Sequence, residues 1–399
     1  MRKKHIPLLS IITLLVSCNQ TNNIKVVTHT APGYFVGDEF VFPMNTLVNL
    51  KMYDENTLDE VSSKFDNIVT SLSKEVDRYH NYENIINLKT INDSCGLNQE
   101  LQLTDSLYEM IELGINLTKI TKGKFNLAMG SIIDLYSSKL SEETSGVFNT
   151  LPEQSLISEA LLSIPTYEDI DSVIQLNKEN KTIKFNKYND KDVIISLGGI
   201  AKGFVMQKAY DYLKEYNYPC LFDAGSSTMG VIGNNPLNDK GTYNISFRNP
   251  LIDNSNYNST ICTVSIKGDA FLSTSGDYTQ NFFYYDENEN VKLMHHIIDP
   301  YTGVSNNYVR EVSLISNNTS LAVLDALSTA IFNIENTEDV LSLIDDIEDY
   351  FNCDISFMLV KPYNNTYDRY NVEMSTSFNK LLISNLIDSV INKKVIENY

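Results

Sequence analysis

Hydrophobic and polar residues alternate along this 399-residue chain with two different periods. The first is the helical period, in which apolar side chains recur every three or four residues along one face. It is clearest in residues 57–79, where the apolar positions are Leu58, Val61, Phe65, Ile68, Leu72 and Val76. The same reasoning predicts further helices over 104–121, 201–216 and 318–333.

The second period is that of extended strands, and it predicts short strands over 40–52, 220–223, 230–232, 243–248 and 261–267. Residues 172–196 predict two strands around a turn at 177–180, the second running directly into Leu197-Gly198-Gly199. A polar stretch over 137–155 predicts a flexible surface insertion. Because short strands and helices mix without a regular βαβ alternation, we predict an α+β fold with two closely joined lobes.

The N-terminus has the pattern of an export signal. A basic start, Arg2-Lys3-Lys4, precedes an apolar stretch over 6–16 that is too short to span a bilayer, which takes about 20 residues. It ends in Leu15-Val16-Ser17-Cys18, which resembles a bacterial lipobox, in which cleavage leaves a lipid-modified cysteine as the first residue. An ordinary cleaved signal peptide with a chance cysteine is the alternative. We expect a signal peptide over 1–17, a lipidated tether over 18–38 and a folded domain over 39–399.

The charge balance narrows the choice of partners. The chain has 31 basic and 51 acidic side chains, a net charge of −20, and loss of the three basic residues of the signal gives −20 − 3 = −23. Binding to nucleic acid needs clustered Lys and Arg, so we exclude nucleic acid as a partner. An acidic protein that binds phosphates would need a cation. The cysteines Cys95, Cys220, Cys262 and Cys353 form no C-x-x-C pair, which argues against structural zinc and leaves their pairing open.

A glycine pair, Gly198-Gly199, lies between a predicted strand and the helix over 201–216. Glycine lets the backbone approach a ligand closely, and a helix N-terminus offers free N–H donors to an anion such as a pyrophosphate. Lys202 would add a full positive charge. Neither standard nucleotide-binding fingerprint is present, so a plain tight turn is the competing interpretation.

The predicted helix over 318–333 is apolar on nearly every side yet carries Asp325, Ser328 and Thr329 on one face. A buried carboxylate is costly unless it is paired or bound to a metal. Asp325 and Thr329, four residues apart, present two oxygens to one point and would suit Mg²⁺. A hydrogen bond from Asp325 to neighbouring backbone, or an ion pair with a lysine, is the alternative.

Two adjacent histidines, His295-His296, precede the turn Asp299-Pro300-Tyr301-Thr302-Gly303. Neighbouring residues of a strand point to opposite faces, so at most one should serve a given site. Histidine accepts protons near neutral pH, although a structural histidine is the alternative. The hydroxyl-rich segment 272–278 is expected to be a small turn, either a helix cap or a nucleophile, and the missing G-x-S-x-G elbow argues against the nucleophile.

Taken together and in order, these segments resemble the FAD:protein FMN transferases of the ApbE family, over about residues 40 to 360. The segments that carry the resemblance are Met44-Asn45-Thr46, 79–82 (Y-H-N-Y), 123–130 (G-K-F-N-L-A-M-G), 197–203 (L-G-G-I-A-K-G), 223–227 (D-A-G-S-S), 273–278 (S-T-S-G-D-Y), 296–303 (H-I-I-D-P-Y-T-G) and 325–330 (D-A-L-S-T-A). Each is weak by itself, whereas eight in the same order are specific.

The resemblance implies an ApbE-like fold with the flavin site between two lobes, and transfer of FMN from FAD to a Ser or Thr of an acceptor flavoprotein with release of AMP. It implies that Asp325, Thr329 and the main-chain carbonyl of Gly199 bind Mg²⁺, and that His296 is the base. The residues implied to line the FAD site are Met44, Tyr82, Asn126, Leu127, Ala128, Ser196, Lys202, Ile298 and Ser328. It also implies an extracytoplasmic bacterial lipoprotein that touches the membrane only through its lipid.

Four positions depart from the family pattern. Ser196 and Asn126 stand where aspartate is usual, Ala128 where threonine is common, and Asn45 in place of glycine. The first two keep hydrogen bonding without charge, which puts the affinity for flavin and a second metal in doubt. Two alternatives therefore stay open, an Mg²⁺-dependent FAD pyrophosphatase and a non-enzymatic FAD-binding lipoprotein.

Overall fold

The computed structural model describes residues 24–140, 145–251, 259–364 and 366–397. The predicted signal peptide and Cys18 lie outside these residues. No helix in the described part of the chain is both long enough and apolar enough to cross a membrane.

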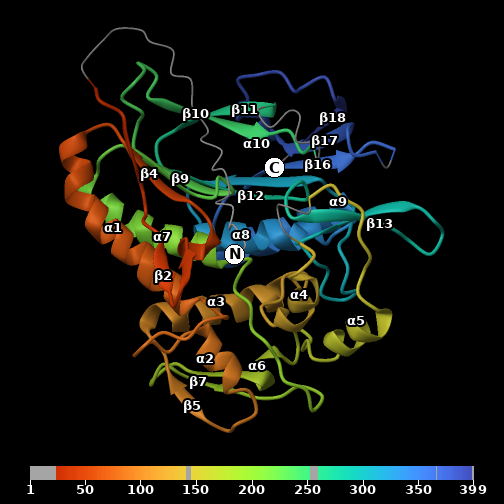
Figure 1. Cartoon of the computed structure of the whole chain (residues 1–399). Coiled ribbons are helices and arrows are strands. Elements are labelled where there is room, and N and C mark those ends of the chain that lie inside the picture. The colour runs from red at the N-terminus through yellow and green to blue at the C-terminus, as the bar shows by residue number, and fades with distance from the viewer. Residues whose placement is uncertain (1–23, 141–144, 252–258, 365, 398–399) are drawn as a thin grey trace, which may run out of the picture.

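A nine-stranded sheet forms the framework of the molecule (Figure 1). Its strands, in spatial order, are β1 (Val27–Thr30), β4 (Val48–Met52), β8 (Cys220–Ala224), β9 (Thr228–Ile232), β12 (Ala270–Gly276), β15 (Glu311–Ser316), β16 (Ser356–Pro362), β17 (Tyr370–Ser375) and β18 (Val390–Ile396). Neighbours pair antiparallel except β17 and β18, which are parallel. Strands distant in sequence therefore lie side by side, and β9, β12 and β15 meet at the centre.

Each face of the sheet carries its own hydrophobic core. One face is covered by α1 (Glu55–Glu75), α7 (Ala201–Tyr216) and α8 (Leu321–Phe332), and the other by β10 (Thr242–Arg248), β11 (Thr260–Lys267) and α10 (Thr376–Leu381) (Figure 1). A helix that is apolar all round has to be enclosed. This is the case for α8, in which every residue except Thr329 is buried.

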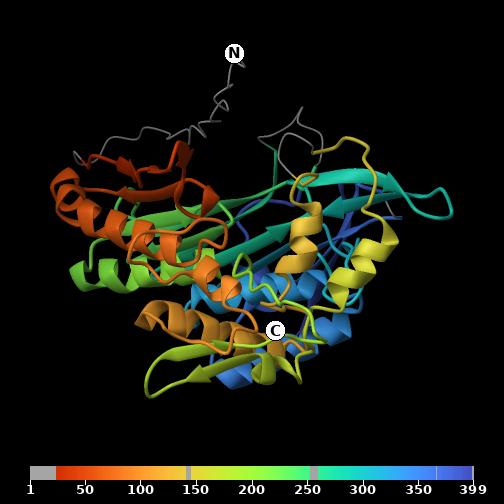
Figure 2. The same cartoon turned by 60° about the horizontal axis from the view of Figure 1, so that its bottom comes forward.

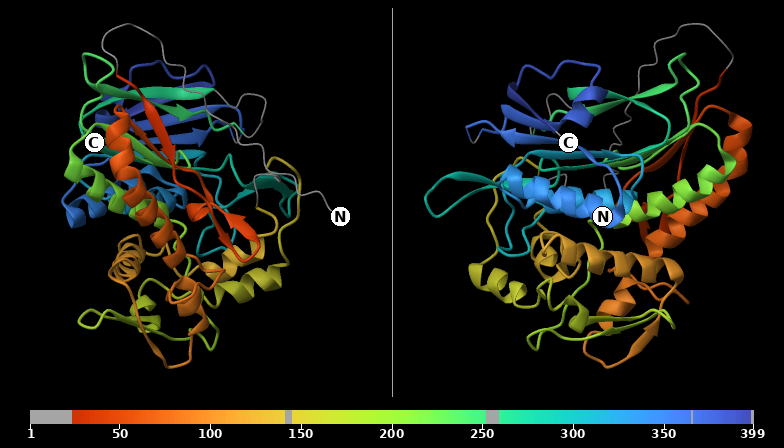
Figure 3. Two further views of the ribbon diagram at one scale, coloured as in Figure 1. Left: turned by 60° about the vertical axis from the view of Figure 1, so that its left-hand side comes forward. Right: turned by 180° about the vertical axis from the view of Figure 1, so that it is seen from behind.

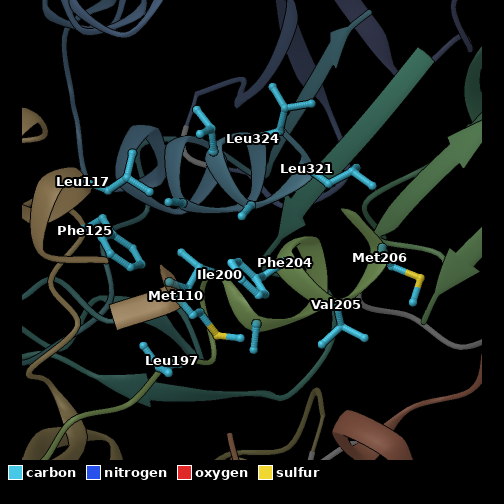
Figure 4. Packing of buried hydrophobic residues seen from close by; sticks show 14 of the residues in the cluster. Met110, Leu117, Phe125, Leu197, Ile200, Phe204, Val205, Met206, Leu321 and Leu324 are labelled. Atoms are coloured by element: carbon cyan, nitrogen blue, oxygen red, sulfur yellow. The ribbon is translucent and has the colours of Figure 1, made fainter. Parts of the chain in front are cut away.

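A second part of the molecule packs against α7 and α8, below them in Figures 1 and 3 and turned toward the viewer in Figure 2. Its elements are α2 (Leu88–Asp93), α3 (Asp105–Ile120), α4 (Gly130–Tyr136), α5 (Gln154–Leu161), α6 (Ile170–Val173) and the sheet β5–β7–β6 (Glu100–Gln102, Thr182–Phe185, Ile174–Asn177), with α9 (Thr337–Phe351) in contact with α3. Figure 4 shows Met110 and Leu117 of α3 facing side chains of α7 and α8. The α+β fold predicted from the sequence is confirmed.

Most predicted helices appear close to their expected limits. The helix over 201–216 has the predicted bounds, and α3 begins after the cap Thr104, whose hydroxyl accepts from Leu107 N. The helix expected over 318–333 is α8, capped by Ser320. The first helix, α1, ends four residues before the expected Tyr79, and Val76 is its C-cap.

The single strand predicted over 40–52 is wrong. The structure has a short hairpin, β2 (Tyr34–Val36) with β3 (Glu39–Val41), then a 3₁₀ turn η1 (Pro43–Asn45), and only then β4. Pro43 has no N–H to donate to a sheet. Met44 and Asn45 adopt φ of 52° and 55°, a left-handed conformation that a continuous strand cannot contain.

Two further sequence expectations need correction. The hairpin of β6 and β7 forms as predicted, but β7 ends at Phe185, and Asn189 and Asp190 at φ of 50° and 60° interrupt any extension toward Gly198. Residues 272–278, expected as a turn, belong mainly to the central strand β12. A strand rich in small hydroxyl residues has little apolar signal, and its pairing with β9 and β15 is nonlocal.

The polar stretch over 137–155 lies on the surface beside a small hairpin of β13 (Asn281–Tyr285) and β14 (Val291–His295). Phe148 bridges to Phe283, and Asn149 N donates to Phe283 O at 2.9 Å. Residues 141–144 lie outside the described chain. The pairing of the four described cysteines is also settled, because all four are free and buried.

Candidate functional site

Asp325 lies in the middle of α8, and its side chain accepts hydrogen bonds from three groups. Ser273 Oγ donates to Oδ1 at 2.7 Å, Thr228 Oγ1 lies 3.0 Å from Oδ1 and 3.2 Å from Oδ2, and Gly203 N donates to Oδ2 at 2.7 Å. The residue is 6% exposed. Burial raises the pKa of Asp325, while nearby Lys202 and the three donors oppose that rise. The carboxylate is thus held in one orientation.

The bond from Gly203 satisfies a backbone donor at the start of α7. Gly203 lies in the first turn of α7, whose N-cap Ile200 has no side chain to accept a hydrogen bond. The N–H of Gly203 is one of the groups at the start of a helix that have no acceptor within the helix itself. Its acceptor is the Asp325 carboxylate, at 2.7 Å. Asp325 therefore caps α7 from a different helix.

Gly199 and Thr329 lie next to each other. A methyl group placed on Gly199 would lie 3.5 Å from Thr329 Oγ1. The Thr329 hydroxyl donates to the Asp325 carbonyl at 3.0 Å, which leaves its own lone pairs available. The structure thus places Gly199 beside Thr329, one turn along α8 from Asp325, and their binding of Mg²⁺ stays a prediction.

These three groups fit a hard cation. A carboxylate, a hydroxyl and a backbone carbonyl are oxygen ligands of the kind Mg²⁺ accepts, with substrate phosphate and water completing its shell. Among the described residues no group of three or more His, Cys, Asp and Glu side chains gathers as a metal site. A cation here would depend on one carboxylate and neutral oxygens. The alternative of a backbone hydrogen bond to Asp325 is also realised, at Gly203.

The sequence did not predict that four hydroxyl side chains gather around Asp325. They belong to Thr228, Ser273, Ser275 and Ser328. Ser273 and Thr228 contact the carboxylate itself, and Ser328 Oγ lies 2.8 Å from Ser275 Oγ and 3.3 Å from Ser273 Oγ. Ser328 also donates to the Asp325 carbonyl at 3.0 Å. The spacing of Ser273 and Ser275 by two residues would have placed them on one face, had the segment been recognised as a strand.

Lys202 lies in the first turn of α7, close to both Asp325 and His296. Its Nζ donates to Ser227 Oγ at 2.6 Å. Its charge lowers the pKa of both Asp325 and His296. A positive side chain at the N-terminus of a helix, beside a potential cation, forms a site that attracts an anion.

The two adjacent histidines differ in burial, in keeping with the prediction that they point to opposite faces. His295 is fully buried, with Nε2 2.8 Å from Asn306 O and Nδ1 accepting from Ile297 N at 3.3 Å. Burial lowers its pKa to about 3, so it is a neutral structural residue. The side chain of His296 is exposed to solvent, although protein atoms crowd around it. This crowding and then Lys202 lower the pKa of His296, against a hydrogen bond with the Thr279 backbone that raises it.

The segment Asn126–Ala128 adjoins the glycine pair through the backbone. Leu127 O accepts from Ser196 N at 2.7 Å, and Leu127 and Ala128 are fully buried. The Asn126 amide donates to Pro165 O at 2.9 Å and accepts from Ala128 N at 2.9 Å. The structure thus places these residues beside the site, with the Asn126 side chain engaged in holding its own loop.

The other residues predicted to line the FAD site have contacts of their own. Met44 lies in the η1 turn, and the next segment meets the 223–227 turn, where Gly225 N donates to Leu47 O at 2.9 Å. Tyr82 donates to Asp77 Oδ2 at 2.7 Å. Ile298 is buried in the small core near β13 and β14. Asn45, which replaces a family glycine, adopts φ of 55°, a conformation that asparagine tolerates better than most residues.

Comparison with known proteins places these features in a wider context. The family model of the ApbE family matches residues 44–351. Similar folds are the ApbE protein of Thermotoga maritima (TM-score 0.65, 20% identity, 88% of this chain and 100% of that chain) and the flavin transferase ApbE of Vibrio cholerae (0.63, 17%, 90% and 100%). The flavinyl transferase ApbE of Pseudomonas stutzeri is similar as well (0.64, 16%, 91% and 98%). Among curated proteins no sequence matches. Because the family model spans most of the chain, this protein belongs to the ApbE family.

Proposed function

We propose that this protein transfers the FMN half of FAD to a Ser or Thr hydroxyl of an acceptor flavoprotein and releases AMP, with Mg²⁺ as cofactor. The observation that carries the proposal is that Asp325 and Thr329, one turn apart on α8, lie beside Gly199 and Lys202 at the N-terminus of α7. Membership of the ApbE family and the fold of the flavin transferases support it.

Asp325, Thr329 and the Gly199 carbonyl would hold the Mg²⁺ ion, which supplies positive charge to the pyrophosphate when bound. The protein must also hold the pyrophosphate without many basic residues, because its net charge is −20. Lys202 and the N-terminus of α7 supply the positive potential that the chain itself offers here. Binding of FAD should therefore depend on the cation.

His296 is the base of the proposed reaction. Its imidazole takes the proton of the acceptor hydroxyl as the hydroxyl oxygen forms a bond to the FMN-side phosphorus. The bond from that phosphorus to the bridging oxygen breaks, and AMP leaves with the bridging oxygen. The lowered pKa of His296 keeps the ring neutral, which is the form that can accept a proton.

Hydrolysis of FAD to FMN and AMP is the second candidate. The exposed side chain of His296 favours it, since water reaches the base as readily as an acceptor side chain would. The two reactions share every step except the identity of the attacking oxygen. Only the requirement for an acceptor separates them.

Product analysis tests the two candidates. The protein is incubated with FAD and Mg²⁺, with and without an acceptor flavoprotein, and free FMN, AMP and bound flavin are measured by chromatography. The transferase predicts AMP in step with flavin bound to the acceptor, and little of either without acceptor. FMN and AMP released at full rate without acceptor would establish the pyrophosphatase, and intact FAD under all conditions would favour a non-enzymatic FAD-binding protein. Asp325→Ala is the negative control.

A further inference from the structure

We propose that Ser273 and Thr228 are positioning residues that orient the Asp325 carboxylate for a divalent cation. The proposal rests on the Mg²⁺ dependence of the proposed function and adds the residues that prepare its carboxylate ligand. Ser273 lies in β12 and Thr228 in β9, and both side chains are buried, at 2% and 1% exposure.

Sheet register explains why these two hydroxyls meet one carboxylate. Ser273 and Thr228 are directly opposite each other in the antiparallel pairing of β12 with β9. Opposite residues of antiparallel strands extend from the same face of the sheet. That face is covered by α8, which carries Asp325. The sheet thus directs two uncharged hydrogen-bond donors, the hydroxyls of Ser273 and Thr228, at the Asp325 carboxylate.

Counting acceptor sites indicates how a cation would bind. An ionised carboxylate has about four lone-pair sites. Three donor groups, the hydroxyls of Ser273 and Thr228 and the N–H of Gly203, already occupy the Asp325 oxygens. The remaining site allows one oxygen to bind a metal, so Asp325 should be a monodentate ligand. Neutral donors also fix the carboxylate without adding a positive charge that would repel the cation.

The neighbouring residue Thr274 supplies a matched control. Its hydroxyl points away from α8 and lies 3.3 Å from Ser313 Oγ on β15. Removing the hydroxyl of Thr274 therefore changes the same strand on the opposite face, leaving the donors to Asp325 in place. Thr228 offers a second control, because Thr228→Ser keeps the hydroxyl while the nearly isosteric Thr228→Val removes it.

The experiment measures binding of Mn²⁺, as a spectroscopic substitute for Mg²⁺, to the purified protein without FAD, by electron paramagnetic resonance of the free ion. Loss of an outer-shell hydrogen bond to a metal ligand typically weakens metal binding about 10- to 100-fold. We expect this weakening for Ser273→Ala and Thr228→Val, whereas Thr228→Ser and Thr274→Ala should bind within about twofold of the parent. Thermal unfolding of the metal-free variants, followed by circular dichroism, checks that each is folded.

The outcomes separate this inference from the function it rests on. If the parent binds Mn²⁺ and transfers FMN, but folded Ser273→Ala and Thr228→Val bind Mn²⁺ as tightly, the positioning role is wrong and the proposed function stands. Equal weakening by Thr274→Ala would also overturn it, since the effect would then be a general one of β12. If the parent binds no Mn²⁺ and transfers FMN equally well in EDTA, the positioning role falls together with the metal. Absence of both activities would refute the proposed function itself.

Discussion

The Asp325 carboxylate has a structural task and, in the proposed function, a chemical one as well. It caps the N-terminus of α7 through Gly203 and lies beside Thr329 and Gly199, the other oxygen ligands expected for the cation. The sequence could predict this residue because a lone aspartate on an apolar helix is conspicuous. Its hydroxyl partners Thr228 and Ser273 could not be predicted, because they reach it through pairing between distant strands.

The pH dependence of transfer should follow His296. Crowding by protein atoms, and then Lys202, lower the pKa of its imidazole to about 4 from the ordinary 6.5. The neutral ring is the reactive form, so activity should persist as pH falls through 6.5 and be lost only as pH approaches the lowered value. Measuring kcat/KM between pH 3.5 and 8, with buffer-stability controls at the acid end, checks this.

His296→Ala should lower the transfer rate about 10²- to 10⁴-fold, the usual contribution of a general base, and should abolish the acid limb of the profile. A parent whose activity already halves near pH 6.5 would show that the site does not lower the pKa of His296. An unchanged rate in His296→Ala would remove the residue from the mechanism.

At the scale of elements, α7 and α8 cross closely, and this crossing keeps Gly203 and Gly199 of one segment in contact with Asp325 and Thr329 of the other. A methyl group on Gly203 would lie 2.3 Å from Leu321 O, a backbone atom that cannot move alone. The sequence predicted both helices but not their contact. The residues that precede and follow Gly203 give no indication that it packs against Leu321, more than a hundred residues away. The strand errors have the same origin, as β12 is defined by its partners β9 and β15.

Gly203→Ala should therefore destabilise the protein. Alanine favours a helix over glycine by about 1 kcal/mol. The clash with Leu321 O outweighs that gain, because overpacking typically costs about 1–3 kcal/mol. Gly198→Ala is the control, since the nearest atom to its new methyl group is Ser196 Oγ at 3.8 Å. Urea unfolding should show a lower midpoint for Gly203→Ala only, and equal midpoints would contradict the close crossing.

Strand β15 carries a buried acid that should make stability depend on pH. Glu311 is fully buried, and burial raises its pKa from 4.5 to about 8, against hydrogen bonds from Ser313 and Tyr278. Between these values the folded state binds more protons than the unfolded state, so the free energy of unfolding falls as pH rises from about 4.5 toward 8 and levels off above it. Glu311→Gln should flatten this decline by more than about 1 kcal/mol.

Chemical denaturation at several pH values between 5 and 9 measures the effect of Glu311→Gln. Glu100→Gln, at an exposed position of β5, is the control for a general change of charge. If the parent and Glu311→Gln lose stability with the same slope, the carboxyl of Glu311 is not protonated in the folded protein at neutral pH.

At the scale of the whole molecule, a chain with a net charge of −20 would have to bind an anionic substrate in the proposed function. Eight short segments in a fixed order were enough to predict the fold class, which the structure confirms, and a set of site ligands, which stays a prediction. The structure adds how distant segments meet. We propose that the protein is anchored to a bacterial membrane through Cys18, on the extracytoplasmic side. The predicted lipobox supports this proposal, and its residues lie outside the described chain.

Replacing Cys18 tests the anchor. Cys18→Ser removes the thiol that would carry the lipid, so the protein should move from the membrane fraction to the soluble fraction when expressed in a bacterium. Fractionation followed by immunoblotting measures this. Retention of Cys18→Ser in the membrane fraction would refute a lipid anchor at this residue.

The intact mass of an acceptor flavoprotein tests the central claim most directly. The acceptor, carrying a Ser or Thr flavinylation motif, is incubated with this protein and FAD, in Mg²⁺ or in EDTA, and its mass is measured. We predict a mass increase equal to FMN less water with Mg²⁺, and no increase with EDTA or with His296→Ala. An acceptor of unchanged mass in Mg²⁺, or one modified equally well in EDTA, would contradict the account.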